Sequence, residues 1–219
     1  MRRIHAGAFV SLDGVMQAPG GPEEDRSCDF PFGGWVAPYW DEVVDASMEP
    51  LFQEPFDLLL GRRTYDIFAA HWPHYDEDPI GHAFDRAAKY VVTSSTAPLS
   101  WANSHALNDG AAGVARVKAS KGPDLVIQGS STLYPDLLAS GLIDRLLLMT
   151  FPVLLGTGKR LFAPGVAPGA LQLVESKVSL SGVVIAAYEP AGPVATGTFE
   201  TKDPSQAELA RREDMKGDA

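Results

Sequence analysis

The sequence of 219 residues predicts an α/β protein, with a mixed sheet and helices on both of its faces. Two observations lead to this class. Apolar runs of strand length alternate with helical patterns as far as about Asp144. After the buried run at 144–150, segments 171–178 and 182–188 predict a closing antiparallel hairpin or an adjacent strand pair.

The first predicted strand is Ile4–Leu12, a run of small and apolar residues that suits a central position. Asp13 and Gly14 follow it. Asp13 could bond its own backbone in a simple Asp-Gly turn, or present a carboxylate to a ligand. Residues 16–36 then form a long loop, and loops of this length often act as lids or binding elements. Its aromatic residues could stack on a flat ligand or fix the loop to the core; these are Phe30, Phe32 and Trp35.

A first helix is predicted to begin near Pro38, because apolar residues recur at helical spacing through Met48. Asp41 and Asp45 are four residues apart and are expected on the solvated face. No acid can be placed on this helix for supporting protonation of a substrate.

The next strand, Phe56–Leu60, leads into Gly61 and a helix expected to begin near Arg63 or Thr64. Arg62 and Arg63 then lie at the positive end of the helix dipole, where a cation is mildly unfavourable. An anion would relieve this, and the planar guanidinium suits phosphate oxygens. Alternatively, both arginines pair with surface carboxylates.

A third strand, beginning at Lys89, ends in the hydroxyl residues Thr93, Ser94, Ser95 and Thr96. Such a run is also typical of a solvated turn. Ligands of open α/β sheets lie at the carboxyl ends of the strands, so this end, the Gly61 turn and the turn at Gly129 after residues 125–128 could share one site.

The strand Leu125–Gln128 runs into Gly129 and then a helix, with Ser130 or Ser131 as the expected N-cap. Glycine allows close approach of a ligand to the backbone, and N–H groups of a first helical turn suit phosphate. A purely structural glycine turn is the alternative. Neither a G-x-G-x-x-G fingerprint nor a Walker A lysine is present.

Four motifs, in order, resemble the dihydrofolate reductase superfamily. They are Ser11-Leu12-Asp13-Gly14, Leu60-Gly61-Arg62-Arg63-Thr64-Tyr65, Gln128-Gly129-Ser130-Ser131-Thr132-Leu133 and Pro152-Val153-Leu154-Leu155-Gly156-Thr157-Gly158. The similarity covers roughly residues 2–190. It is greater to the branch containing the C-terminal reductase domain of the bifunctional riboflavin-biosynthesis deaminase/reductase than to the folate enzyme. The resemblance implies a three-layer α/β/α fold, with a mostly parallel sheet and an antiparallel C-terminal strand pair.

The resemblance also implies NADPH as the cofactor. The turn Gly61, Arg62, Arg63, Thr64 and the strand end Thr93, Ser94, Ser95 would hold the 2′-phosphate and pyrophosphate. Backbone N–H groups of Gly129, Ser130 and Ser131, with Thr132 adjoining, would face the pyrophosphate. The first strand from Ala8 to Val10 would run beside the nicotinamide, and Asp13 would orient or protonate the substrate. Members of this superfamily commonly form homodimers, so a homodimer is also implied.

Composition narrows the remaining possibilities. A formal net charge of −10 argues against nucleic-acid binding, and no apolar stretch approaches membrane-spanning length. The single cysteine, Cys28, suits a reducing compartment, and a cytoplasmic location is expected. The histidines show no metal-ligand spacing, so no metal site is predicted. Residues 1–190 are expected to form the reductase domain, and the small and charged residues 191–219 a flexible tail or frayed helix.

The leading hypothesis is an NADPH-dependent reductase that transfers a hydride to a small pteridine- or pyrimidine-like heterocycle. One alternative is a module that binds a dinucleotide without turnover. Another is the ribosylamino-pyrimidine phosphate reductase of riboflavin biosynthesis, whose substrate phosphate would need a second basic cluster. Lys159-Arg160 is the candidate for that cluster.

Overall fold

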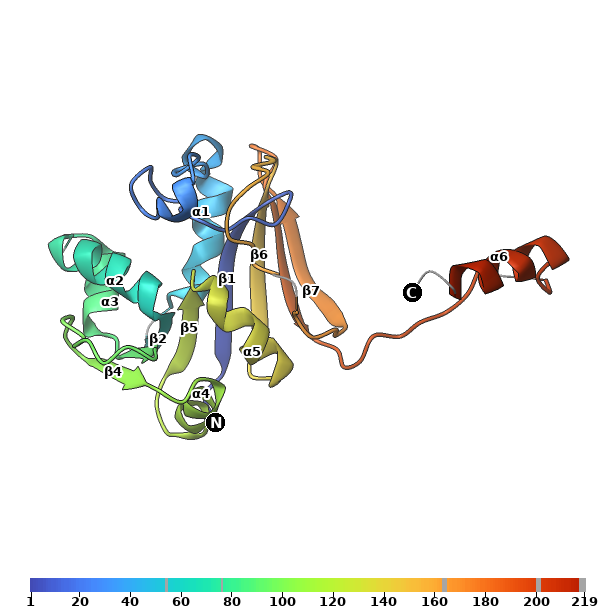
Figure 1. Ribbon diagram of the computed structural model, residues 1–219. Helices are drawn as coiled ribbons and strands as arrows, with labels where there is room; N and C mark the ends of the chain where they lie inside the picture. The colour runs from blue at the N-terminus through green and yellow to red at the C-terminus, as the bar shows by residue number, and fades with distance from the viewer. Residues whose placement is uncertain (54, 76, 163–164, 200–201, 217–219) are drawn as a thin grey trace.

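The computed structural model describes residues 1–53, 55–75, 77–162, 165–199 and 202–216. One sheet organises the chain, with strand order β4-β3-β2-β5-β1-β6-β8-β7 (Figure 1). The strands are β1 (Ile4–Ser11), β2 (Phe56–Gly61), β3 (Lys89–Val92), β4 (Ser104–Leu107), β5 (Asp124–Gln128), β6 (Arg145–Phe151), β7 (Leu171–Val178) and β8 (Val184–Pro190). Strands β1 to β6 pair in parallel, whereas β8 pairs antiparallel with β6 and β7. The predicted mixed sheet with its antiparallel C-terminal pair is confirmed.

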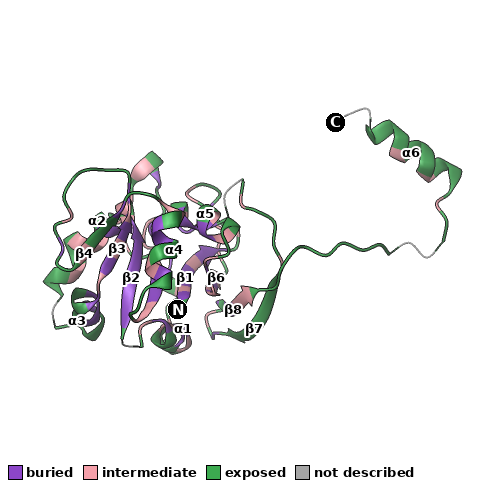
Figure 2. Ribbon diagram, turned by 90° about the horizontal axis from the view of Figure 1, so that it is seen from below, coloured by how far each residue is buried: buried purple, intermediate pink, exposed green. Residues whose placement is uncertain are grey.

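Helices cover both faces of the sheet. The α-helices are α1 (Glu42–Met48), α2 (Arg62–His71), α3 (Pro79–Arg86), α4 (Ala111–Ala119), α5 (Tyr134–Ala139) and α6 (Gln206–Lys216). Short 3-10 helices occur at Ser27–Asp29, Ala37–Tyr39, Glu49–Leu51, Trp72–His74 and Ser131–Leu133. Val114 of α4 and Leu137 of α5 pack on one face with Ile4 and Leu125. Helices α1, α2 and α3 pack on the other, so the core has two layers separated by buried strands (Figure 2).

The first helix begins later than its apolar spacing indicates. Residues Ala37–Tyr39 form a 3-10 helix, and α1 starts at Glu42 because Asp41 caps it. The Asp41 carboxylate accepts hydrogen bonds from the N–H groups of Val43 and Val44, both at 3.0 Å. It also accepts one from Ser181 N–H at 3.0 Å. Asp41 therefore belongs to a cap and not to a freely solvated face, whereas Asp45 is exposed as expected.

The long loop after β1 is fixed to the core by two of its three aromatic residues. Phe30 and Trp35 are buried, and the Trp35 indole donates a hydrogen bond to the backbone oxygen of Gln17 at 2.8 Å. Phe32 is 45% exposed and packs edge-on against Phe30. The first strand ends at Ser11, so Leu12 lies in the following turn and is exposed.

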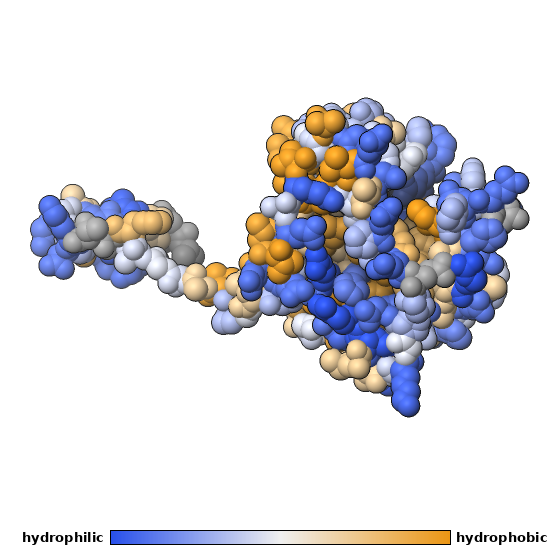
Figure 3. Space-filling model, turned by 180° about the vertical axis from the view of Figure 1, so that it is seen from behind, coloured by the Kyte–Doolittle hydropathy of each residue, from blue (hydrophilic) through white to orange (hydrophobic). Residues whose placement is uncertain are grey.

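The C-terminal part of the sheet is open to solvent. All residues of the edge strand β7 are exposed. Helix α6 lies apart from the sheet in Figure 1, and none of its residues is buried. In Figure 3, hydrophobic side chains gather on the side of the molecule from which the C-terminal segment departs. Within the described ranges, no helix is both long and apolar enough to cross a membrane.

Candidate functional site

Hydrogen bonds join the ends of β2 and β5. The Gly61 N–H donates to the hydroxyl of Ser130 at 2.9 Å, and the Ser130 N–H donates to the hydroxyl of Thr64 at 3.0 Å. Thr132 lies close by, since a Cβ built on Gly61 would be 3.6 Å from its hydroxyl oxygen. Each of the two bonded hydroxyls accepts from a backbone N–H, so its own hydrogen can be donated to a ligand. Two turns far apart in sequence thus form one polar surface.

The turn after β5 differs from the predicted helix start. Ser130 adopts a left-handed conformation with φ of 62° and makes no side-chain cap, and Ser131–Leu133 form a 3-10 helix before α5 begins at Tyr134. Ser130 therefore stands at the N-cap position of the 3-10 helix, as expected, but its side chain makes no capping hydrogen bond, and the N-cap residue of α5 is Leu133. The Ser130 N–H, expected to face a phosphate, is engaged by Thr64. Gly129 has φ of +70°, which favours glycine, and a Cβ there would make a tight contact of 3.2 Å with the Thr64 methyl.

Helix α2 begins at Arg62, one residue before the expected start, with Gly61 as N-cap. Arg62 bonds the Asp66 carboxylate at 2.9 and 3.1 Å and donates to the backbone oxygen of Ala97 at 2.9 Å. The second contact ties α2 to the chain after β3. At that strand end, Thr93 is buried and its hydroxyl accepts from the Ser95 N–H at 3.0 Å, whereas Ser94 and Ser95 are exposed.

The first strand supplies an open backbone edge next to these turns. Pairing of β1 with β5 ends at Gly7 and Gln128, whereas pairing with β6 continues to Ser11 and Phe151. Residues 8–11 therefore project beyond the β5 ladder, beside the turn that begins at Gly129. The side chains of Ala8 and Val10 are buried in the core with α4 and α5. Main-chain groups alternate along β1: Arg3 O faces β5 and Ile4 O faces the β6 side, so the backbone of Ala8 and Val10 also faces β6. The backbone on the open β5 side is that of Phe9, since the Ser11 N–H donates to Val15 O at 2.8 Å.

Asp13 connects the turn after β1 to the loop after β6. Its carboxylate accepts hydrogen bonds from the Ser11 hydroxyl at 2.6 Å and from the N–H groups of Leu155 and Gly156 at 3.1 and 2.9 Å. Arg160 donates to the Asp13 backbone oxygen. The Ser11 hydrogen bond is the largest influence on the pKa of the Asp13 carboxyl; the Leu155 and Gly156 N–H groups add to it, and together they outweigh burial and lower the pKa to about 2. Asp13 is thus an ionised clamp between two of the four motifs.

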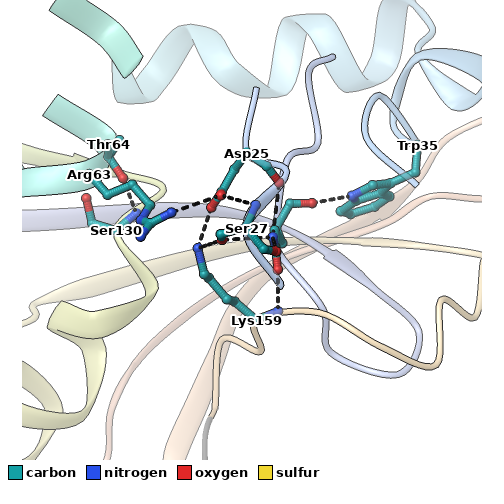
Figure 4. A network of polar contacts seen from close by, with 8 residues as sticks. Asp25, Ser27, Trp35, Arg63, Thr64, Ser130 and Lys159 are labelled. Carbon is teal, nitrogen blue, oxygen red and sulfur yellow. Dashed lines mark hydrogen bonds and ion pairs between the residues drawn. The ribbon is translucent and has the colours of Figure 1, made fainter. Parts of the chain in front are cut away.

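Asp25 connects the start of α2 with the loop after β6 (Figure 4). It forms ion pairs with Lys159 and, at 3.1 Å, with Arg63. Burial raises the pKa of the Asp25 carboxyl, but hydrogen bonds from Lys159 and Ser27 outweigh it and lower the pKa to about 2. Sequence reasoning missed Asp25, because its partners lie 38 and 134 residues away. The signal present was a run of acids, Glu23-Glu24-Asp25, in a chain that carries two adjacent arginines at the turn after β2.

The Asp25 segment and α2 enclose an open cleft of about 870 Å³. One wall carries Glu23, Glu24 and Asp25, and the other carries Arg62 and Arg63. The basic wall is the end of α2 at which a phosphate would be stabilised. Both arginines have carboxylate partners, Asp66 and Asp25, so the paired alternative describes them in this structure. Among the described residues, no group of three or more His, Cys, Asp and Glu side chains could hold a metal ion.

The chain is similar to several known proteins in sequence and in structure. YwjB of Bacillus subtilis (strain 168), an uncharacterized protein, is 31% identical over 159 residues, which are 70% of this chain and 78% of YwjB. A pyrimidine reductase-like protein from Corynebacterium diphtheriae superposes with a TM-score of 0.57 at 13% identity, covering 87% of this chain and 92% of that one. Dihydrofolate reductase from Enterococcus faecalis, complexed with NADP(H), superposes with a TM-score of 0.54 at 14% identity, covering 86% and 96%. Both structures share the fold.

The family model for the RibD C-terminal domain matches residues 2–185, which include β1 through β7, the first two residues of β8 and all four motifs. The resemblance inferred from those motifs is therefore confirmed. This chain belongs to the RibD C-terminal domain family and has a dihydrofolate reductase-like fold.

Proposed function

We propose that this protein is an NADPH-dependent reductase acting on a small pteridine- or pyrimidine-like heterocycle. One observation carries the proposal. Residues 8–11 of β1 project past β5 beside a turn that is bonded to the N-terminus of α2. A backbone edge next to hydroxyl and arginine groups suits a ligand with a polar amide ring at one end and phosphates at the other.

The residues present fit such a dinucleotide. Thr64 and Ser130 retain hydroxyl hydrogens for phosphate oxygens. Arg62 is held between Asp66 and Ala97 beside the exposed hydroxyls of Ser94 and Ser95, which together suit a 2′-phosphate. NADPH, when bound, supplies the hydride. The family also supports this assignment, since the E. faecalis reductase that shares the fold is complexed with NADP(H).

For the substrate, we propose the α1 side of β1. Phe9 faces that side and packs edge-on against Trp40 with ring centroids 5.6 Å apart. Trp40 is 42% exposed and offers a flat apolar surface for a heteroaromatic ring. The chain's share of catalysis would be to hold this ring against the cofactor and to exclude water. Asp13 can orient a substrate donor, but as an ionised carboxylate it is a poor proton donor.

The contacts of Asp13 favour the second candidate, a dinucleotide-binding module without turnover. The carboxylate expected near the substrate is occupied by Ser11, Leu155 and Gly156 as a structural clamp. The riboflavin-pathway alternative needs a free basic cluster for the substrate phosphate. Lys159 and Arg160 are instead engaged with Asp25 and Asp13. Oxidation of NADPH in the presence of pteridines or aminopyrimidines discriminates a reductase from a binding module.

The experiment that tests cofactor binding is thermal unfolding with NADPH and with NADH. The proteins are wild type, the double variant Arg62→Ala, Arg63→Ala, and the control Arg145→Ala. Arg145 is the first residue of β6 and pairs with Glu175 of β7, away from the turns after β2 and β5. A ligand at 100 times its Kd stabilises the folded state by about 2.7 kcal/mol. We expect NADPH to raise the Tm more than NADH, in wild type and the control but not in the double variant. Absence of a shift with both nucleotides would reject the proposed cofactor.

A further inference from the structure

We propose that Asp25 is an internal competitor for the cofactor phosphate at Arg63, so that it weakens dinucleotide binding. The inference rests on the proposed function, and concerns regulation of the same site. Its basis is the position of the Asp25 carboxylate, which pairs with Arg63 at 3.1 Å near the N-terminus of α2 (Figure 4). The Nη1 N–H that Arg63 directs at this carboxylate is not available to a phosphate, so full two-pronged binding of a phosphate by Arg63 requires release of Asp25.

The two ends of this ion-pair bridge are held unequally. At one end, Lys159 bonds Asp25 and also donates to the Ser27 hydroxyl at 2.7 Å. The Lys159 N–H donates to the Gln17 side-chain oxygen at 3.0 Å. The Gln17 amide in turn donates to the backbone oxygens of Asp25 and Ser27 at 3.0 and 2.9 Å. The Asp25 segment is thus fixed to the loop after β6 by several bonds.

The Arg63 end is held by one contact. The Arg63 side chain is 62% exposed, whereas that of Asp25 is 10% exposed. A single ion pair to an exposed arginine is weak and breaks readily. Arg63 is therefore the part that moves, turning from Asp25 to a phosphate in the adjoining cleft while Asp25 stays with Lys159. Asp25 keeps its negative charge near the incoming phosphate and opposes binding by repulsion as well as by competition.

The test measures NADPH binding to Asp25→Asn by titration calorimetry. Asparagine keeps the shape of the side chain and removes its charge. We expect the Kd of NADPH to fall by about three- to tenfold, a range in keeping with the loss of one partly exposed pair and one nearby negative charge. Glu23→Gln is the control, because it makes the same charge change in the same segment, at a residue that pairs with exposed Arg26 instead.

A double-mutant cycle with Arg63→Ala tests the route of the effect. If Asp25 acts through Arg63, Asp25→Asn tightens binding more in wild type than in the Arg63→Ala background, where only the repulsion between Asp25 and the phosphate remains. Equal tightening in both backgrounds would show that Asp25 does not compete at Arg63. If wild type binds NADPH and the Kd of Asp25→Asn is equal or higher, the inference about Asp25 is overturned and the proposed function is not. Equal tightening by Glu23→Gln also overturns it. Failure of wild type and Asp25→Asn alike to bind NADPH rejects the proposed function and this inference with it.

Discussion

The hydroxyl of Ser130 accepts a hydrogen bond from the backbone N–H of Gly61, 69 residues earlier in the chain, at 2.9 Å. This bond fixes the distance between the turn after β2 and the turn after β5. Ser130 is buried, and it reaches Gly61 because its backbone takes the left-handed conformation that follows Gly129. The strained backbone and the bond belong together, since an extended Ser130 would continue the strand away from β2.

Two substitutions separate the contributions of the Ser130 backbone and hydroxyl. Ser130→Ala leaves the Gly61 N–H without its acceptor and keeps the left-handed strain, so we expect a loss of about 1–3 kcal/mol in unfolding free energy. Ser130→Gly loses the same hydroxyl but removes the strain, and should be roughly 1 kcal/mol more stable than the alanine variant. Urea unfolding measures both. Equal stability of the alanine variant and wild type would show that the hydrogen bond contributes nothing.

Asp13 is expected to act chiefly on stability and its pH dependence. The pKa of its carboxyl is about 2 in the folded protein, below the ordinary value of 3.8. Its contribution to stability is therefore fully present above about pH 4 and is lost as the pH falls from there toward 2. We expect Asp13→Asn to be less stable than wild type at pH 7, with the difference shrinking between pH 4 and pH 2.5 in urea unfolding.

Asp45→Asn is the matched control for this measurement, because Asp45 is an exposed acid of α1. It should follow wild type at every pH. If the Asp13→Asn protein kept the stability of wild type but lost NADPH oxidation, Asp13 would have a role in the reaction. That outcome would contradict the clamp.

Much of the fold could be predicted from the sequence because it depends on local patterns. The strand Phe56–Leu60 is wholly apolar apart from one residue, and the structure extends it by Gly61 alone. The boundary of α1 was misplaced because apolar spacing continues back to Trp40, while the start of the helix depends on the Asp41 cap. The cap depends on one side chain, whereas the apolar spacing is a pattern of several residues. The spacing therefore indicates an earlier helix start than the cap allows.

The residues of the candidate site could be predicted from the sequence, but the hydrogen bonds between them could not. Gly61, Thr64 and Ser130 were expected near one another because the carboxyl ends of strands meet at one edge of a sheet. Which hydroxyl accepts from which N–H depends on the left-handed turn at Ser130, which no side-chain pattern reveals. The role of Asp25 depends on Lys159, which reaches it only through the tertiary fold.

Lys89 should make the protein more stable as the pH rises through the alkaline range. It is fully buried, donates to the Asp85 backbone oxygen at 2.7 Å, and lies 4.1 Å from the Trp101 ring centroid. Burial lowers its pKa from 10.5 to about 8. Between these values the unfolded chain binds more protons than the folded one, so stability rises with pH there, by up to about 3 kcal/mol.

The comparison that isolates this effect is wild type against Lys89→Met, which cannot titrate at this position. Unfolding free energies at pH 7, 8, 9 and 10 should show wild type gaining on the methionine variant above pH 8. Parallel curves for the two proteins across this range would show that Lys89 keeps an ordinary pKa.

Two copies of the chain are expected to pair through β7, the edge strand whose residues are all exposed. Leu171, Leu173, Val174 and Val178 are each more than 40% exposed, and such a row of apolar side chains on an unpaired strand edge favours association. Light scattering after gel filtration should give a dimer for wild type and a monomer for Leu173→Lys, because a charge in the centre of the contact must be desolvated. Leu209→Lys, an equivalent change on α6 away from the sheet, should remain dimeric. A monomeric wild type would reject the pairing, and a dimeric Leu173→Lys protein would place the contact elsewhere on the surface.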